Sequence, residues 1–278
     1  MSGGAVNRID AMFAAKRAAG RRAMIFYLTA GHPSLAATEE AIGALVEAGA
    51  DLIELGIPFS DPIADGPTIQ KSSKAALDGG VKVEDAIELA RRARARSETP
   101  LIFFSAFNPI LHFGLKRFAD AAAEVGADGM LVPDLPPEEA GELEALCRAR
   151  DLKLVFLAAP TTTEARARLI AGHSSGFIYY ISLRGVTGAR QSLPPDLKEK
   201  LEVLRRASDL PLAVGFGIAR PEHARLVGAV ADGVVVGSAL VELIGRAADS
   251  PTFKQDIVRF ARGLIEALPV DRAPVSST

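Results

Sequence analysis

Short, almost wholly apolar runs alternate along the chain with longer segments in which apolar residues recur every three or four positions. A run that is apolar on both faces is typical of a parallel strand covered on both sides, whereas the longer spacing is typical of an amphipathic helix. The runs lie at 24–30, 51–55, 101–105, 129–132, 154–157, 176–182, 212–214 and 233–236. Helical sequence follows each run, so the pattern predicts successive β/α units.

Eight consecutive β/α units close into a (β/α)8 barrel, so we predict an α/β fold of the TIM-barrel type. An amphipathic segment at 7–19 predicts an extra helix ahead of the first strand. An open doubly wound sheet is the alternative, but it normally carries a glycine-rich fingerprint after its first strand, and the sequence AGHP at 30–33 is not one. We expect a single barrel domain over 1–268 and a disordered C-terminal tail over 269–278.

Composition narrows the class of protein. Hydrophobic residues make up 49% of the 278 residues, enough for a large core, and the net charge is −2 without a basic stripe. We therefore expect no binding to nucleic acid. The chain has no N-terminal apolar signal segment, and no apolar run approaches the roughly 18 residues that a membrane span needs. These features predict a cytoplasmic protein that does not bind membranes.

Cysteine, histidine and lysine positions argue against several kinds of chemistry. Cys147 is the only cysteine and lies in a helical pattern, so we expect a buried structural thiol and no disulfide. The four histidines are scattered without the spacing of metal ligands, which argues against a metal site. None of the nine lysines lies at the carboxyl end of a predicted strand, which argues against a Schiff-base aldolase. With metal and Schiff-base chemistry disfavoured, the remaining type of catalysis is proton transfer by carboxylates.

The stretch at 51–68 contains the strongest candidates for such chemistry. Glu54 lies near the carboxyl end of a predicted buried strand, where an ionised carboxylate is costly unless the site uses it. Asp65 lies in the following proline-rich loop, from which it can lean back over the mouth of the barrel. Two carboxylates that differ in burial suit general acid–base catalysis. Alternatively, Glu54 pairs with a core cation, and Asp65 is a turn or capping residue.

Glycines follow the last two predicted strands, at 215–217 and at 237–238. Loops at these positions of a barrel often bind phosphate, because glycine lets backbone amides approach an anion at a helix N-terminus. We expect Ser238 to add a hydroxyl and to cap the following helix. The glycine-rich loop at 184–189 is typical of a lid. Within it, Gly188 could add an amide to the phosphate site, and Thr187 could bond to a carboxylate of the other loop.

Two tyrosines complete the set of candidates. Tyr27 and Tyr179 lie near the ends of the first and sixth predicted strands, where both could line the same cavity. The alternative for each is a core aromatic residue with its hydroxyl satisfied. Together these residues indicate a barrel enzyme that transfers protons on a small phosphate ester.

Several motifs of the chain resemble those of a known family, the tryptophan synthase alpha chain. The resemblance rests on ELGIPFSDP at 54–62 with ADGPTIQ at 64–70, and on the later motifs GVTG at 185–188, GFGI at 215–218 and GSA at 237–239. They occur in the family's order and extend over nearly the whole chain. The resemblance implies a barrel lyase that cleaves indole-3-glycerol phosphate to indole and glyceraldehyde 3-phosphate in tryptophan biosynthesis.

The resemblance also implies roles for individual residues. Glu54 and Asp65 take the catalytic positions, and Tyr179 takes the position of a supporting tyrosine. Gly188, Gly217, Gly237 and Ser238 fall at phosphate-binding positions of the family. The other expected substrate-binding residues are Tyr27, where the family commonly has phenylalanine, Thr187 and Phe216, which would enclose the indole ring with other apolar side chains. Protonation of the indole ring at C3 can make the ring an electron sink, so neither a lysine nor a metal ion is required, and no cofactor is expected in this chain.

A partner is implied as well. The family's alpha chain forms an alpha2-beta2 heterotetramer with a beta chain, which holds pyridoxal phosphate and receives the indole. Pro58 and Asp61, together with the stretch around Asn108, resemble the docking surface. Two rival interpretations stay open: a different phosphosugar-isomerising barrel that shares only the phosphate loops, and a non-catalytic barrel that regulates or docks to a partner.

Overall fold

The computed structural model describes residues 6–62, 65–181, 194–215 and 217–271. Its strands are all parallel and form one sheet. The strands are β1 Ala23–Thr29, β2 Leu52–Gly56, β3 Leu101–Phe104, β4 Gly129–Leu131, β5 Lys153–Val155, β6 Leu157–Ala158, β7 Ile178–Ile181, β8 Leu212–Gly215 and β9 Gly233–Val236.

The sheet closes through one interrupted strand. Its order is β5-β4-β3-β2-β1-β9-β8-β7-β6, so its two ends, β5 and β6, are neighbours in sequence and are separated only by Phe156. The segment 153–158 pairs with β4 through its first half and with β7 through its second half. The eight predicted strands therefore appear as nine segments, and the barrel with an extra N-terminal helix is confirmed.

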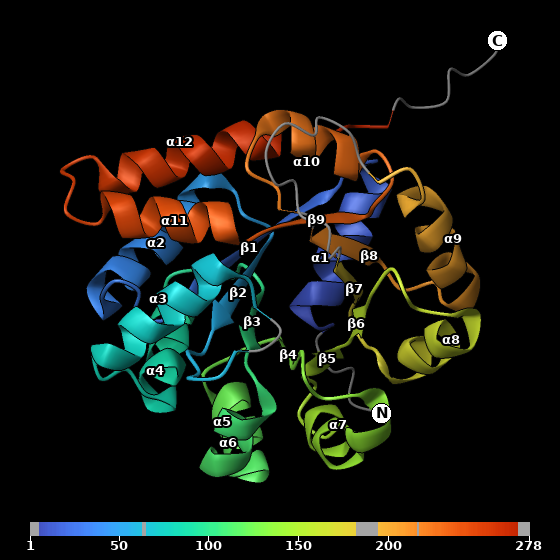
Figure 1. The fold of residues 1–278 in the computed structure, drawn as a ribbon, viewed down its shortest axis with the longest axis horizontal. Coiled ribbons are helices and arrows are strands. Elements are labelled where there is room, and N and C mark those ends of the chain that lie inside the picture. The colour runs from blue at the N-terminus through green and yellow to red at the C-terminus, as the bar shows by residue number, and fades with distance from the viewer. Residues whose placement is uncertain (1–5, 63–64, 182–193, 216, 272–278) are drawn as a thin grey trace.

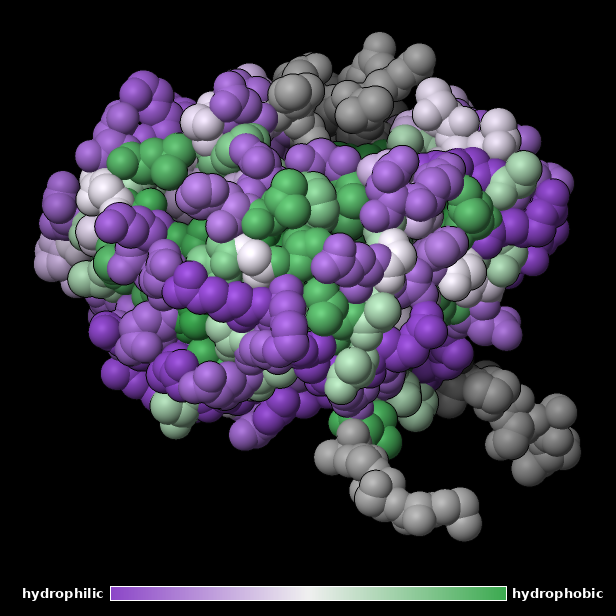
Figure 2. Space-filling view, turned by 90° about the horizontal axis from the view of Figure 1, so that it is seen from below, coloured by the Kyte–Doolittle hydropathy of each residue, from purple (hydrophilic) through white to green (hydrophobic). Residues whose placement is uncertain are grey.

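Helices form a ring around the strands (Figure 1). They are α1 Arg8–Ala18, α2 Leu35–Ala48, α3 Pro67–Asp78, α4 Val83–Arg94, α5 Phe107–Phe113, α6 Leu115–Glu124, α7 Gly141–Arg148, α8 Glu164–His173, α9 Leu197–Ala207, α10 Pro221–Gly228, α11 Ser238–Ala247 and α12 Phe253–Glu266, with a short 3₁₀ helix at Pro137–Glu139. Their apolar faces pack on the outer side of the sheet in a large core that includes Phe26, Ile53 and Phe103. On the face shown in Figure 2, hydrophilic residues surround separate groups of hydrophobic ones.

Helix α1 closes the amino-terminal end of the barrel. The side chain of its N-cap, Asn7, accepts a hydrogen bond from the amide of Ile9 at 3.0 Å and donates to the carbonyls of Asp128 and Asp151. Ile9 and Phe13 pack into the barrel interior, where the ring of Phe13 lies 5.6 Å from that of Phe177. A barrel sealed at this end leaves the opposite, carboxyl-terminal mouth for a site.

One helix departs from the sequence prediction. The third predicted strand ends at 105, and the Asn108-Pro109 pair after it is typical of a loop, but α5 spans Phe107–Phe113. Pro109 is the third residue of this helix, and the first residues of a helix have no intrahelical acceptor for their amides. Proline is therefore tolerated there, and the pair begins a helix instead of a loop.

Of the predicted C-terminal tail at 269–278, only the first three residues lie within the described part of the chain. Asp271 accepts hydrogen bonds from the guanidinium of Arg22 at 2.8 and 3.0 Å. Its amide donates to the carbonyl of Gly20. Among the helices that are described, none is both long and apolar enough to span a membrane. Cys147 is buried, as predicted, and burial raises the pKa of its thiol to about 12.

Candidate active site

Glu54 points into the barrel near the carboxyl end of β2. Side chains alternate along a strand, and Leu52, two residues earlier, belongs to the cluster that fills the barrel interior. Glu54 lies opposite Tyr27 of β1 and Ile102 of β3. Its side chain is fully buried, and neither carboxylate oxygen has a hydrogen-bond partner among the described residues. Burial alone raises its pKa to about 8, so Glu54 holds a proton at neutral pH.

Asp65 lies just before α3, in the loop that follows β2. Its amide donates to the carbonyl of Pro62 at 3.0 Å, and the side-chain amide of Gln70 donates to the carbonyl of Asp65 at 2.9 Å. Burial, with a smaller contribution from the negative charge of Asp134, raises the pKa of Asp65 to about 6. Asp65 is therefore mostly ionised at neutral pH, the opposite protonation state to that of Glu54.

Both predicted tyrosines lie beside these carboxylates. Tyr27 and Tyr179 are 7% and 9% exposed, and a Cβ added to Gly56 or Gly215 would meet the respective phenol oxygen at 2.2 or 2.4 Å. Burial and the charges of Glu54 and Asp65 raise the pKa of both phenols, so both stay protonated. The two hydroxyls are thus available for hydrogen bonding near the carboxylates.

A cavity of about 260 Å³ opens at the mouth of the barrel beside β1, β2 and β3. Its lining includes Tyr27, Phe59, Asp65, Phe104 and Asp134. Apolar rings and a few polar groups are the usual composition of a site for a small organic molecule. An aromatic substrate placed here would lie against Phe104 and within reach of Asp65.

The glycine segments after β8 and β9 occupy the same end of the barrel. Gly217 adopts a φ of +62°, in the left-handed region that favours glycine. Gly237 is the N-cap of α11 and Ser238 its first residue, without a side-chain capping bond. The prediction that Ser238 caps this helix is therefore wrong, because the helix begins one residue earlier than expected. Within the described residues, no side chain caps the first amides of α11, so these amides can bind an anion.

Three predicted substrate-binding residues, Thr187, Gly188 and Phe216, lie outside the described residues. The predicted docking residues differ in exposure. Pro58 is buried, whereas Asp61 and Asn108 are exposed. Asp61 accepts a hydrogen bond from the hydroxyl of Ser60 at 2.7 Å and lines the same cavity as Asp65.

Asp134 is a site residue that the sequence analysis missed. It follows β4 in chain order, and its Oδ1 accepts a hydrogen bond from the amide of Phe107 at 2.8 Å. Its charge helps to raise the pKa of Asp65. The signal that identified Glu54, a carboxylate at the carboxyl end of a strand, would have found Asp134 as well.

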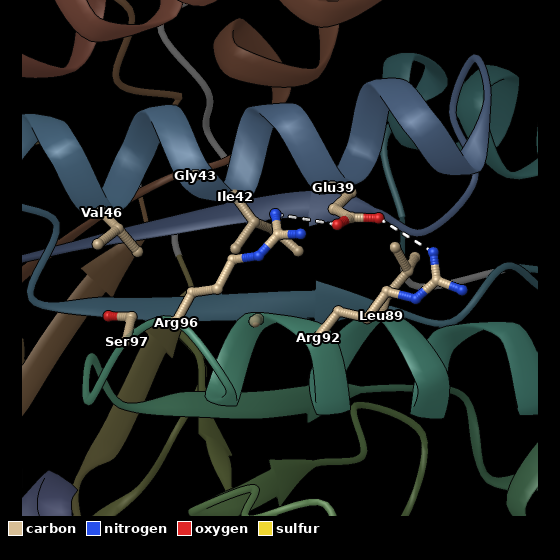
Figure 3. A pocket seen from close by; sticks show the side chains of 9 residues that line it. Glu39, Ile42, Gly43, Val46, Leu89, Arg92, Arg96 and Ser97 are labelled. Atoms are coloured by element: carbon tan, nitrogen blue, oxygen red, sulfur yellow. Dashed lines mark hydrogen bonds and ion pairs between the residues drawn. The ribbon is translucent and has the colours of Figure 1, made fainter.

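Other features lie away from this mouth. A cavity between α2 and α4 is lined by Ile42, Leu89 and Glu39, whose carboxylate pairs with Arg92 and Arg96 (Figure 3). It contains none of the predicted site residues. Among the described residues, no group of three His, Cys, Asp or Glu side chains is placed to hold a metal ion. Lys153, the lysine in β5, lies at the amino end of its strand and pairs with Asp10.

Comparison with known proteins identifies similar chains. The family model described as the tryptophan synthase alpha chain matches residues 13–267. The tryptophan synthase alpha chain of Geobacter sulfurreducens is 44% identical over 263 residues, which cover 95% of this chain and 99% of that protein. The alpha chain of Geobacter sp. strain M21 is 49% identical over 237 residues, which cover 85% of this chain and 89% of that protein.

The chain is also similar to solved structures of tryptophan synthase. The structure of tryptophan synthase subunit alpha from Legionella pneumophila superposes with a TM-score of 0.88 at 38% identity, covering 95% of this chain and 99% of that one. A chain of Mycobacterium tuberculosis tryptophan synthase superposes with a TM-score of 0.87 at 35% identity, with the same two coverages.

Proposed function

Since this chain belongs to the family of the tryptophan synthase alpha chain, we propose that Glu54 and Asp65 perform the proton transfer and charge stabilisation of the family's reaction. That reaction makes the protein a carbon–carbon lyase of tryptophan biosynthesis, which cleaves indole-3-glycerol phosphate to indole and glyceraldehyde 3-phosphate. The observation that carries the assignment is the buried carboxyl of Glu54, which has no partner within the described protein.

The cleavage is a retro-aldol reaction in which the indole ring accepts electrons. The Glu54 carboxyl transfers its proton to C3 of the ring, and positive charge develops at the ring nitrogen. Asp65 accepts a hydrogen bond from the ring N–H and stabilises this charge. The Glu54 carboxylate then takes the proton of the glycerol hydroxyl next to C3. As the carbon–carbon bond breaks, its electron pair returns to the ring, which releases indole and an aldehyde and restores protonated Glu54.

The protonation states at neutral pH suit this sequence of steps. A proton donor at C3 must hold a proton, and Glu54, with a pKa of about 8, does so. A group that stabilises a cation must be ionised, and Asp65, with a pKa of about 6, is mostly ionised. The difference arises because Glu54 lies inside the barrel, whereas Asp65 lies on a loop at its mouth.

The remaining residues bind and orient the substrate. We assign the phosphate to the amides around Gly217, Gly237 and Ser238, at the N-terminus of α11. Gly188 adds an amide to this site, Thr187 bonds to Asp65, and Phe216 encloses the indole. Tyr179 donates a hydrogen bond near Glu54, since its phenol stays protonated. These assignments rest on the sequence motifs together with the position of the strand ends.

A beta chain is the partner that this family suggests. We propose an alpha2-beta2 complex in which the pyridoxal phosphate belongs to the beta chain and this chain's own reaction uses no cofactor. Asp61 and Asn108 are exposed and suit a docking surface, and Asp61 also lines the cavity. Pro58 is buried, so its part in docking is to hold the loop that presents Asp61. Residues 1–268 are proposed to form one cytoplasmic barrel domain.

The test is indole release from indole-3-glycerol phosphate by the wild type and by Glu54→Gln, each with and without a beta chain. We expect turnover by the wild type, a further increase with the beta chain, and at least a thousandfold loss in the variant, which cannot donate a proton. Near-normal turnover by Glu54→Gln would contradict its role. An inactive wild type with the partner present would contradict the proposed reaction.

A further inference from the structure

A chain of three buried hydroxyls leads from the cavity to helix α3. The hydroxyl of Tyr27 lies 3.4 Å from Oγ1 of Thr29, which lies 2.7 Å from Oγ of Ser72. The hydroxyl of Ser72 lies 2.8 Å from the carbonyl oxygen of Ile69. Thr29 and Ser72 are 2% and 1% exposed, so water does not replace either contact.

The carbonyl at the end of this chain fixes the direction of every hydrogen bond in it. A carbonyl only accepts, so Ser72 must donate its single proton to Ile69. Ser72 therefore accepts from Thr29, and Thr29 in turn accepts from Tyr27. The reverse order would leave the oxygens of Ser72 and Ile69 2.8 Å apart without a proton between them.

With its proton donated to Thr29, the phenol oxygen of Tyr27 presents its lone pairs to a ligand. Its proton is directed away from the cavity toward Thr29, which leaves its lone pairs available. The side chain lines the cavity that also contains Asp65, and its ring packs edge-on against Phe104 with the centroids 5.2 Å apart. The phenol oxygen lies against Gly56, two residues after Glu54, so it is close to the reacting groups.

We propose that Tyr27 is a substrate-binding residue whose phenol oxygen accepts a hydrogen bond from a glycerol hydroxyl of the substrate. Thr29 and Ser72 are positioning residues that set this polarity from α3. The inference rests on the proposed function, because the substrate it names has two such hydroxyls. The indole N–H is the other donor of the substrate, and it is assigned to Asp65. The hydrogen bond between Thr29 and Ser72 also connects β1 to α3, the helix that follows the Asp65 loop.

The first test is Tyr27→Phe, which keeps the ring and removes the oxygen. We expect kcat/KM for indole-3-glycerol phosphate to fall about three- to tenfold, the usual effect of one neutral hydrogen bond. The dissociation constant of indole-3-propyl phosphate, which has no glycerol hydroxyl, should change less than about twofold. An unchanged kcat/KM would overturn the proposal. Equal weakening of substrate and analogue would also overturn it, because Tyr27 would then contact the indole or the phosphate.

The second test separates positioning from stability with a double-mutant cycle. Ser72→Ala should lower kcat/KM about two- to threefold, and it should have no further effect when Tyr27 is already phenylalanine. Ser73→Ala is the matched control, because Ser73 is also buried in α3 but lies outside the hydroxyl chain. Losses that multiply in the double variant would show that Ser72 does not act through Tyr27. Thr29→Val provides the same cycle if Ser72→Ala does not fold.

The wild type distinguishes this inference from the proposed function. An inactive wild type would contradict the proposed reaction and, with it, the substrate named here. A wild type that releases indole while Tyr27→Phe releases it equally well would contradict this inference alone.

Discussion

Glu54 and Asp128 are two buried carboxylates of the same barrel with opposite surroundings. Asp128 lies immediately before β4, at the amino-terminal end of the barrel, and is 2% exposed. It accepts hydrogen bonds from Arg94 at 2.7 Å, from Arg8 at 3.1 Å and from the amide of Leu101 at 2.8 Å. Glu54, at the carboxyl-terminal end, has no such partner among the residues that the structure describes.

The difference separates a structural carboxylate from one that we propose transfers a proton. Burial raises the pKa of both groups, but at Asp128 the arginines and the Leu101 amide oppose that effect, whereas no described residue opposes it at Glu54. A satisfied carboxylate holds β3, β4 and α1 together at the closed end of the barrel. An unsatisfied one keeps a proton that it can give to a substrate at the open end.

Asp65 extends this comparison most sharply, because it is a third carboxylate and is proposed to act by its charge. Asp65→Asn keeps the size of the side chain and its hydrogen-bonding capacity but removes the charge that stabilises the cationic ring. We expect kcat to fall about a hundredfold with an unchanged melting temperature. Steady-state indole release measures the effect, and Asp61→Asn, on the same loop, is the control for a general loop effect. A near-normal kcat would contradict the charge-stabilising role.

Asp128→Asn tests the other side of the comparison. The substitution leaves the guanidinium of Arg94, whose side chain is 13% exposed, without its carboxylate. We expect the free energy of unfolding to fall by about 2 to 4 kcal/mol, while kcat stays within about twofold of the wild type. Urea denaturation and indole release measure the two quantities. A large loss of kcat in fully folded protein would mean that Asp128 is not purely structural.

The titration of Glu54 should also make the free energy of unfolding depend on pH, an effect that is smaller than the two above and has a definite sign. The pKa of Glu54 is raised from an ordinary 4.5 to about 8, so the folded protein binds one more proton than the unfolded chain between these values. Stability from this group is complete below pH 4.5 and is lost as the pH rises to 8. Relative to Glu54→Gln, the wild type should lose on the order of 1 kcal/mol per pH unit between pH 5 and 8. Parallel curves in urea denaturation would contradict a buried, protonated Glu54.

Much of this architecture could be predicted from the sequence because buried parallel strands leave an unmistakable pattern. Leu52, Ile53 and Leu55 face both sides of the sheet, so Glu54, the charged residue among them, was identified as a candidate site residue. Helix α5 could not be predicted in this way, because Pro109 indicates a chain break unless its place in the first helical turn is known.

Details that depend on packing between distant segments also escaped prediction. The hydroxyl chain joins Thr29 to Ser72, which lie 43 positions apart and show no periodicity that would connect them. The contact between Asp134 and the amide of Phe107 depends on how β3 and β4 end side by side. The N-cap of α11 is Gly237 and not the predicted Ser238, and sequence patterns rarely resolve a difference of one residue at a helix end.

The most direct test of the central claim is the protonation state of Glu54 in the folded protein. Infrared difference spectra of the wild type against Glu54→Gln can be recorded between pH 6 and 10. We predict a carboxylic-acid carbonyl band at pH 7 that belongs to Glu54 and disappears with a midpoint near pH 8. A difference spectrum that shows only ionised carboxylate at pH 7 would contradict Glu54 as the proton donor.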